Sequence, residues 1–136
     1  AAKKGRDINS QTADVTEFYT PREIAALHGL LDAADEAARD NEEVRRRIAF
    51  LRTGLDFTEL QAEIYRLLRI SSQRRLEPDE RNRAIQLLDK KYVMMRDIFE
   101  HNHFAVNVAV MSWSEWGRFK KLGWDGPATK DQPGTR

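Results

Sequence analysis

The sequence predicts an all-α fold, an antiparallel three-helix bundle followed by a shorter fourth C-terminal helix. Along three long segments, apolar residues recur at spacings of three and four, as on one face of a helix. Pro21 and Pro78 stand where two of these segments begin, and proline suits the first helical position. The connections between the segments are short, so consecutive helices are expected to be antiparallel neighbours.

The first long helix is predicted to start at Pro21, with Thr20 as its cap. Glu23 stands three residues after Thr20, which completes a capping box, and Tyr19 is placed to pack on Ile24. The helix is expected to end near Asp40 and Asn41. Its predicted core face consists of Ile24, Leu27, Leu31, Ala34 and Ala38.

The second helix is predicted to open at Asp40 or Asn41, with Glu42 and Glu43 in its first turn, where acidic groups suit the helix dipole. It carries two apolar seams. The phase slips between them beside Gly54, so a bend or a change of neighbours is expected there. The seams are Val44, Ile48, Leu51 and Leu55, then Phe57, Leu60, Ile64 and Leu67.

The third helix is predicted to start at Pro78, with Asp79 and Glu80 in its first turn. Its apolar residues step by three and four, which is the most regular seam of the chain. Leu51 in the second helix and Met95 in the third lie mid-seam, so both are expected to be core residues. The third seam consists of Ile85, Leu88, Tyr92, Met95 and Phe99.

The C-terminal third allows two interpretations. Residues 104–110 alternate as a strand would, but no second strand is available to pair with them. A helix that continues to Phe119 places Phe104, Val108 and Met111 on one face, and we favour it. The predicted organisation is therefore a flexible segment 1–16, a helical bundle domain 17–125 and a flexible tail 126–136.

Composition excludes several classes of protein. The 136 residues contain no cysteine, which removes disulfide scaffolds, thiolate metal sites and cysteine nucleophiles. No run of about 18 uncharged apolar residues occurs, so no membrane partner is expected. The first residues, up to Arg6, show no signal-peptide pattern. A net charge of +1 does not favour nucleic acid, although arginines gather between Arg66 and Arg83.

No catalytic, cofactor-binding or metal-binding residue is predicted. His101 and His103 would diverge on a helix, and we interpret His28 as a residue at the boundary of an apolar face. Carboxylates that are neighbours on one helix, such as Asp32 and Asp35, are typical of a solvated surface. The motifs of hydrolases, metalloproteases and nucleotide-binding proteins are absent from the sequence. The chain alone is therefore not expected to be an enzyme.

The tryptophans form the most unusual local feature. Trp113, Trp116 and Trp124 lie within twelve residues, together with Phe119. They could fill or cap the core of the bundle, and this is the interpretation we favour. They could also form an interaction face toward another domain or a second copy of the chain, since large aromatic residues suit such contacts. Stacking on a sugar ring is a third alternative.

Three stretches resemble one recurring module. Tyr19–Pro21, Leu30–Ala34 and Val44–Leu55 are similar to the helical C-terminal region of large bacterial glycoside-hydrolase-like (α-glucuronidase-like) proteins of uncharacterised function. The similarity covers Tyr19 to Leu60 well and the remainder only in general character. In that family a (β/α)-barrel precedes the module and would carry any carboxylate chemistry, so no catalytic residue is assigned here.

The resemblance implies a non-catalytic accessory domain that packs on or supports the barrel of a longer polypeptide. Its partners would be other domains of the same protein, and its location would be extracellular or periplasmic. The alternative is a stand-alone interaction or dimerisation module that uses the face of Trp113, Trp116 and Phe119. No cofactor is expected for either.

Overall fold

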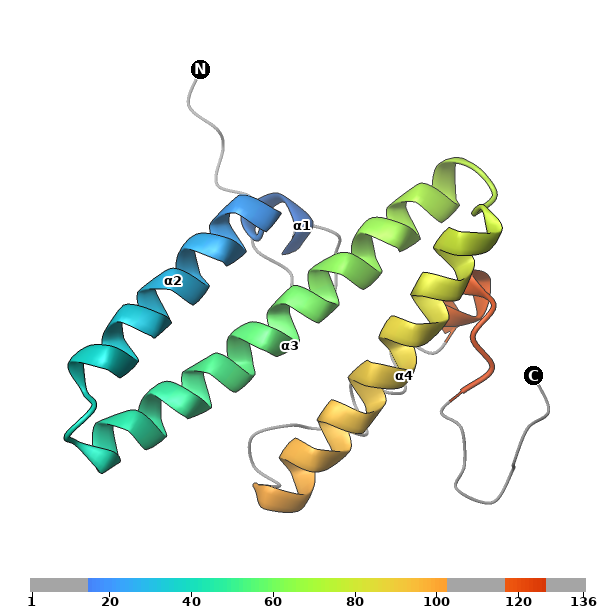
Figure 1. Ribbon diagram of the computed structural model, residues 1–136. Helices are drawn as coiled ribbons and strands as arrows, with labels where there is room; N and C mark the ends of the chain where they lie inside the picture. Colours follow the sequence, from blue (N-terminus) through green and yellow to red (C-terminus); the bar gives the residue numbers. More distant parts are fainter. Residues whose placement is uncertain (1–14, 103–116, 127–136) are drawn as a thin grey trace, which may run out of the picture. The chain divides into compact units, whose positions relative to one another are not determined.

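A computed structural model describes residues 15–102 and 117–126, and every element within them is helical. The prediction of an all-α chain is confirmed for this part. None of its helices is long and apolar enough to cross a membrane. The elements are α1 (Val15–Phe18), α2 (Pro21–Ala37), α3 (Glu42–Gln73), α4 (Pro78–His101) and the 3₁₀ helix η1 (Lys120–Leu122) (Figure 1).

The chain divides into two compact units whose boundary falls inside α3, between Arg66 and Leu67. The first unit contains α1, α2 and most of α3. The second contains the end of α3, α4 and η1. The arrangement of three helices as one bundle stays a prediction.

The start of α2 confirms the predicted capping box. The Thr20 hydroxyl accepts a hydrogen bond from the Glu23 backbone N–H, and the Glu23 carboxylate accepts one from the Thr20 backbone N–H at 2.9 Å. That backbone bond first, and the Thr20 hydroxyl second, lower the pKa of Glu23. Two donors that an α-helix leaves without partners are thereby satisfied.

The helix α2 ends at Ala37, earlier than the predicted end near Asp40. The backbone leaves the helix through a short turn, in which the Asn41 N–H donates to the Ala38 carbonyl at 2.8 Å. Asn41 then caps α3, because its side-chain oxygen accepts a hydrogen bond from the Val44 N–H at 3.1 Å. The predicted start of this helix at Asp40 or Asn41 is therefore confirmed.

The helix α3 runs without interruption past Gly54 and ends at Gln73. At 32 residues it is about 48 Å long. The next helix, α4, starts at Pro78 as predicted, with Glu77 and Glu80 forming its capping box. It ends at His101, whose Nδ1 lies 2.7 Å from the Asp97 carbonyl oxygen.

The predicted seams are only partly buried. Ile24, Ile48 and Leu55 are buried in the first unit, as are Leu88 and Met95 in the second. The prediction was wrong for Leu51, which is 59% exposed, and the other exposed seam residues are Leu27, Ala34, Val44 and Phe99. A helix buries only the residues that face its neighbour, and these apolar stripes are wider than the buried line of contact.

Candidate functional site

The helices α2 and α3 of the first unit form an antiparallel hairpin held by side-chain contacts along its length. As the residue number on the α2 side rises, the number of its partner on α3 falls. The two helices are therefore antiparallel, and the pairs show which residues lie opposite one another. The contacts include Tyr19 carbonyl to Arg66 (2.6 Å), His28 to Glu59 (3.0 Å), Asp32 to Arg52 (2.8 Å) and Asp35 to Arg45 (3.1 Å).

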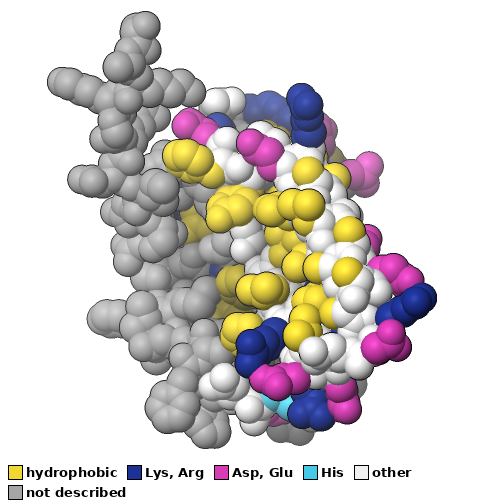
Figure 2. All heavy atoms as spheres, turned by 90° about the vertical axis from the view of Figure 1, so that its left-hand side faces the viewer, with side chains coloured by type: hydrophobic (Ala, Val, Ile, Leu, Met, Phe, Trp, Pro, Cys, Tyr) yellow, Lys and Arg dark blue, Asp and Glu magenta, His cyan; other side chains and the backbone are white. Residues whose placement is uncertain are grey.

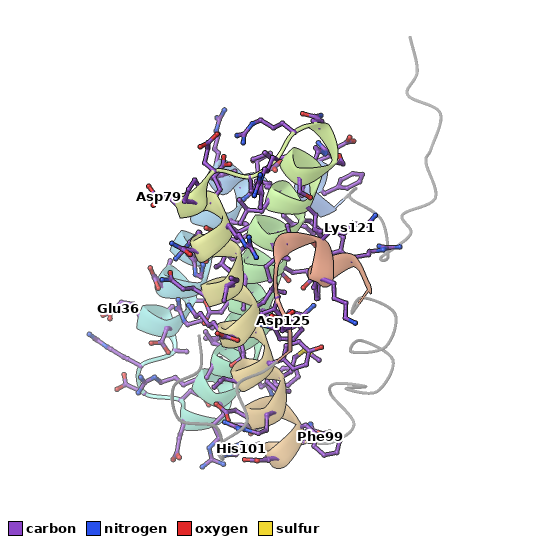
Figure 3. All side chains as sticks on the ribbon, turned by 90° about the vertical axis from the view of Figure 1, so that its right-hand side faces the viewer. Glu36, Asp79, Phe99, His101, Lys121 and Asp125 are labelled. Atoms are coloured by element: carbon purple, nitrogen blue, oxygen red, sulfur yellow. The ribbon has the colours of Figure 1, made fainter. Side chains whose placement is uncertain are left out.

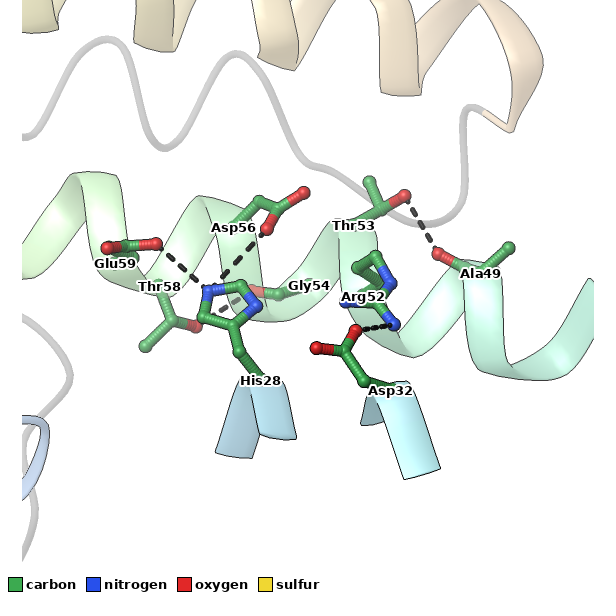
Figure 4. A network of polar contacts seen from close by, with 9 residues as sticks. All are labelled: His28, Asp32, Ala49, Arg52, Thr53, Gly54, Asp56, Thr58 and Glu59. Atoms are coloured by element: carbon green, nitrogen blue, oxygen red, sulfur yellow. Dashed lines mark hydrogen bonds and ion pairs between the residues drawn. The ribbon is translucent and has the colours of Figure 1, made fainter. Parts of the chain in front are cut away.

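His28 meets two carboxylates of α3 rather than one (Figure 4). Its Nε2 lies 3.0 Å from Glu59 Oε2 and 3.9 Å from Asp56 Oδ1. One ligand atom from each of the three side chains falls within 4.8 Å of the others. Asp56 and Glu59 are three residues apart and therefore share a face of α3. About half of each of the two carboxylate side chains is exposed, and 28% of the imidazole is.

These two carboxylates differ from their neighbours in charge pairing. In the part of the chain that the structure describes, neither Asp56 nor Glu59 has an ion pair with arginine or lysine, and His28 is the basic partner of both. Other carboxylates of the hairpin pair with an arginine, as Glu36 does with Arg39. Four of these pairs lie on α3 or join it to α2. They are Asp32 with Arg52, Asp35 with Arg45, Glu42 with Arg46 and Glu43 with Arg47.

One side of the hairpin carries an apolar strip, which consists of Leu27, Leu30, Val44 and Leu51. Leu27, Val44 and Leu51 each come one position before a residue of the charged contacts. A residue one position before a contacting residue is turned away from the partner helix, always in the same sense along the chain. Because the two helices run antiparallel, this turn brings the side chains of both helices to the same side of the hairpin. All four side chains are exposed, Leu30 by 67%. Figure 2 shows hydrophobic side chains gathered over this region.

In the second unit, the residues after η1 pack on α4. Trp124 stacks on Tyr92 with ring centroids 4.7 Å apart, and it meets the Phe119 ring edge-on at 6.2 Å. Lys91, itself buried, places its ammonium group 4.7 Å from the centre of the Phe119 ring. Of the four aromatic residues for which the sequence favoured a core role over an interaction face, Phe119 and Trp124 are completely buried. Trp113 and Trp116 lie outside the described residues.

A basic pocket opens in the second unit beside the turn between α3 and α4, with a volume of about 690 Å³. Figure 3 labels Asp79 near the start of α4 and Lys121 on η1, the two elements that border it. Its lining cations include Arg75, Arg81, Lys120 and Lys121. Within the described residues, none of these four has an ion pair.

Two other arginines of the predicted Arg66–Arg83 cluster bind different partners within the chain. Arg66 holds the Tyr19 carbonyl in the first unit, and Arg74 makes two 2.7 Å hydrogen bonds to the Glu80 carboxylate. Sequence reasoning found Arg75 and Arg81 but missed Lys120 and Lys121, which are about 40 residues away and reach the pocket only through the fold.

Sequence reasoning also missed the cluster of His28, Asp56 and Glu59. The spacing of Asp56 and Glu59 was visible, but the approach of His28 depends on the register of the hairpin. No family model, no curated protein sequence and no solved structure matches this chain. The resemblance to the glycoside-hydrolase-like proteins therefore stays a prediction.

Proposed function

We propose that this chain is a non-catalytic helical accessory module of a larger glycoside-hydrolase-like protein, and that it packs on another domain through the apolar strip. The exposure of Leu27, Leu30, Val44 and Leu51 on one side of the hairpin carries the proposal. The resemblance over Tyr19–Leu60 supports it, because that region includes the whole strip.

Physical chemistry favours covering this strip. Moving a leucine side chain fully out of water is worth about 1.5–3 kcal/mol. Contiguous apolar patches on a surface mark sites of association, whereas single exposed apolar residues are common. A domain seated on the strip would bury several such side chains at once.

The alternative, self-association through Trp113, Trp116 and Phe119, has less support. Phe119 is fully buried and offers no surface to a partner. The four residues of the strip are all exposed, so the strip is the surface to test.

The experiment measures the protection of a cysteine introduced into this chain, which itself has none, and follows the labelling at that residue. Leu51→Cys and the control Arg39→Cys are made both in this chain and in the longer polypeptide, which is expressed from its full reading frame. Arg39 is a suitable control because its side chain is 72% exposed at the turn between α2 and α3.

We expect maleimide to react with both cysteines in the isolated chain. In the longer polypeptide, the reaction at residue 51 should slow by at least about tenfold, since a covered thiol reacts only during transient opening, while residue 39 stays fast. Equal rates at residue 51 in both settings would contradict the proposal, as would a native polypeptide of only 15.8 kDa.

A second candidate function is the binding of a small phosphate-bearing anion in the basic pocket. The four cations without ion pairs favour it, since clustered positive charge attracts phosphate. Isothermal titration with pyrophosphate should show binding that Arg81→Gln and Lys121→Gln each weaken several-fold. Lys90→Gln, on α4 outside the pocket lining, is the control, and an equal loss in this variant would indicate nonspecific attraction.

A further inference from the structure

We propose that His28, Asp56 and Glu59 form a surface binding site for a divalent transition-metal ion, with Zn²⁺ as the ion of choice. The proposal is independent of the proposed function, because these residues lie on the charged contacts of the hairpin and not in the apolar strip. It assigns to His28 a role as a ligand, where the sequence indicated only a boundary residue.

The donor set fits the chemistry of zinc. An imidazole nitrogen and two carboxylate oxygens are ligands that Zn²⁺ accepts at about 2.0–2.2 Å, usually in a tetrahedral arrangement. Ligand atoms around such an ion are about 3.3 Å apart, from the same bond lengths. The 3.0 Å and 3.9 Å separations of His28 Nε2 from the two carboxylates bracket that spacing. Small rotations of exposed side chains would complete it.

The charge of the cluster favours a cation. With a neutral imidazole the three side chains carry two negative charges, and within the described residues no arginine or lysine forms an ion pair with either carboxylate. The paired acids of the same hairpin, such as Asp32 with Arg52, show that arginine partners are common on these helices. A divalent ion would supply the missing positive charge.

The hairpin holds the ligands in place before the ion arrives. The contacts Tyr19–Arg66 and Asp32–Arg52 lie on either side of the cluster and fix the register of α2 against α3. Binding therefore needs little ordering of the backbone, and the ion would clamp the two helices together. Exposure of the carboxylates leaves solvent access for the remaining coordination positions.

The test uses the full chain without an affinity tag. Isothermal titration with ZnSO₄ should show one ion bound per chain, and Mg²⁺ at the same concentration should not compete, because it prefers oxygen ligands in octahedral geometry. Co²⁺ supplies a second readout, since its visible absorption reports the number and type of its ligands.

His28→Ala and Glu59→Gln should each weaken Zn²⁺ binding at least about tenfold, and Zn²⁺ should raise the Tm of the original chain but of neither variant. Glu59→Gln keeps the size of the side chain, so a loss of binding with an unchanged circular dichroism spectrum excludes misfolding. His101→Ala is the matched control and should bind normally. Unchanged affinity in His28→Ala, equal loss in His101→Ala, or no binding by the original chain would each overturn the proposal.

Discussion

The indole N–H of Trp124 donates a hydrogen bond to the Asp89 carboxylate at 3.0 Å. The bond joins the segment after η1 to the middle of α4, across 35 positions of sequence. Together with the contact between the Trp124 and Tyr92 rings, it ties that segment to the helix.

Replacement of Trp124 by alanine should destabilise the second unit strongly. The side chain is fully buried, and truncation of a buried tryptophan removes about 3–5 kcal/mol. The free energy of unfolding in urea measures the loss. Lys121→Ala, an exposed neighbour on η1, should change it by less than about 0.5 kcal/mol, and a similar loss in both variants would contradict the packing described.

Leu51 and Leu88 should respond differently to truncation, although the sequence placed both in core seams. Leu88→Ala should cost about 2–5 kcal/mol because its side chain is completely buried. Leu51→Ala should cost less than about 1 kcal/mol in the isolated chain, since most of the side chain is already in water. Urea unfolding of both variants checks this, and a large loss at Leu51 would show that the strip is covered within this chain.

Two glycines should respond to alanine in opposite directions. Gly54 lies in α3 with nothing within 4 Å of an added Cβ, so Gly54→Ala should stabilise the chain by about 0.5–1 kcal/mol. Gly123 has φ +84°, and its added Cβ would meet the Arg81 side chain. Gly123→Ala should therefore cost about 1–2 kcal/mol.

A double variant separates the two causes at Gly123. Arg81→Ala removes the atoms that an added Cβ would meet but leaves the backbone strain unchanged. If strain dominates, as expected for a flexible arginine that can move aside, Gly123→Ala should cost nearly the same in the Arg81→Ala background. Full recovery in the double variant would instead assign the cost to the contact.

The pairing of Glu80 with Arg74 should be visible in a pH titration. The hydrogen bonds from Arg74, followed by one from the Glu77 backbone N–H, lower the pKa of Glu80 to about 2. The folded chain thus favours the carboxylate. The stabilisation from this pair is complete above the ordinary pKa of glutamate, about 4.3, and is lost as the pH falls from there through about 2.

Carbon NMR of the Glu80 carboxyl group measures this pKa directly. In Arg74→Met the pKa should rise toward its ordinary value, because the first cause of the shift is gone. Arg75→Met, which keeps both hydrogen bonds to Glu80, should leave it near 2. An unchanged value in Arg74→Met would contradict the stated cause.

The positions at which most helices begin could be predicted from the sequence alone. Thr20, Glu23, Asn41 and Pro78 act within about four residues of the backbone groups that they satisfy, so their effect can be read locally. The earlier end of α2 was not predicted, because Ala38 and Arg39 would also fit a helix and the turn bonds decide against it.

The packing of the helices, in contrast, sets which side of each apolar stripe is buried and which distant side chains meet. Leu51 and Leu55 belong to the same seam, yet the first is 59% exposed and the second is buried. The approach of His28 to Asp56 and Glu59, and of η1 to Arg81, likewise depends on contacts between segments far apart in the chain. Periodicity describes a helix surface, whereas burial and binding geometry depend on the neighbour placed against it.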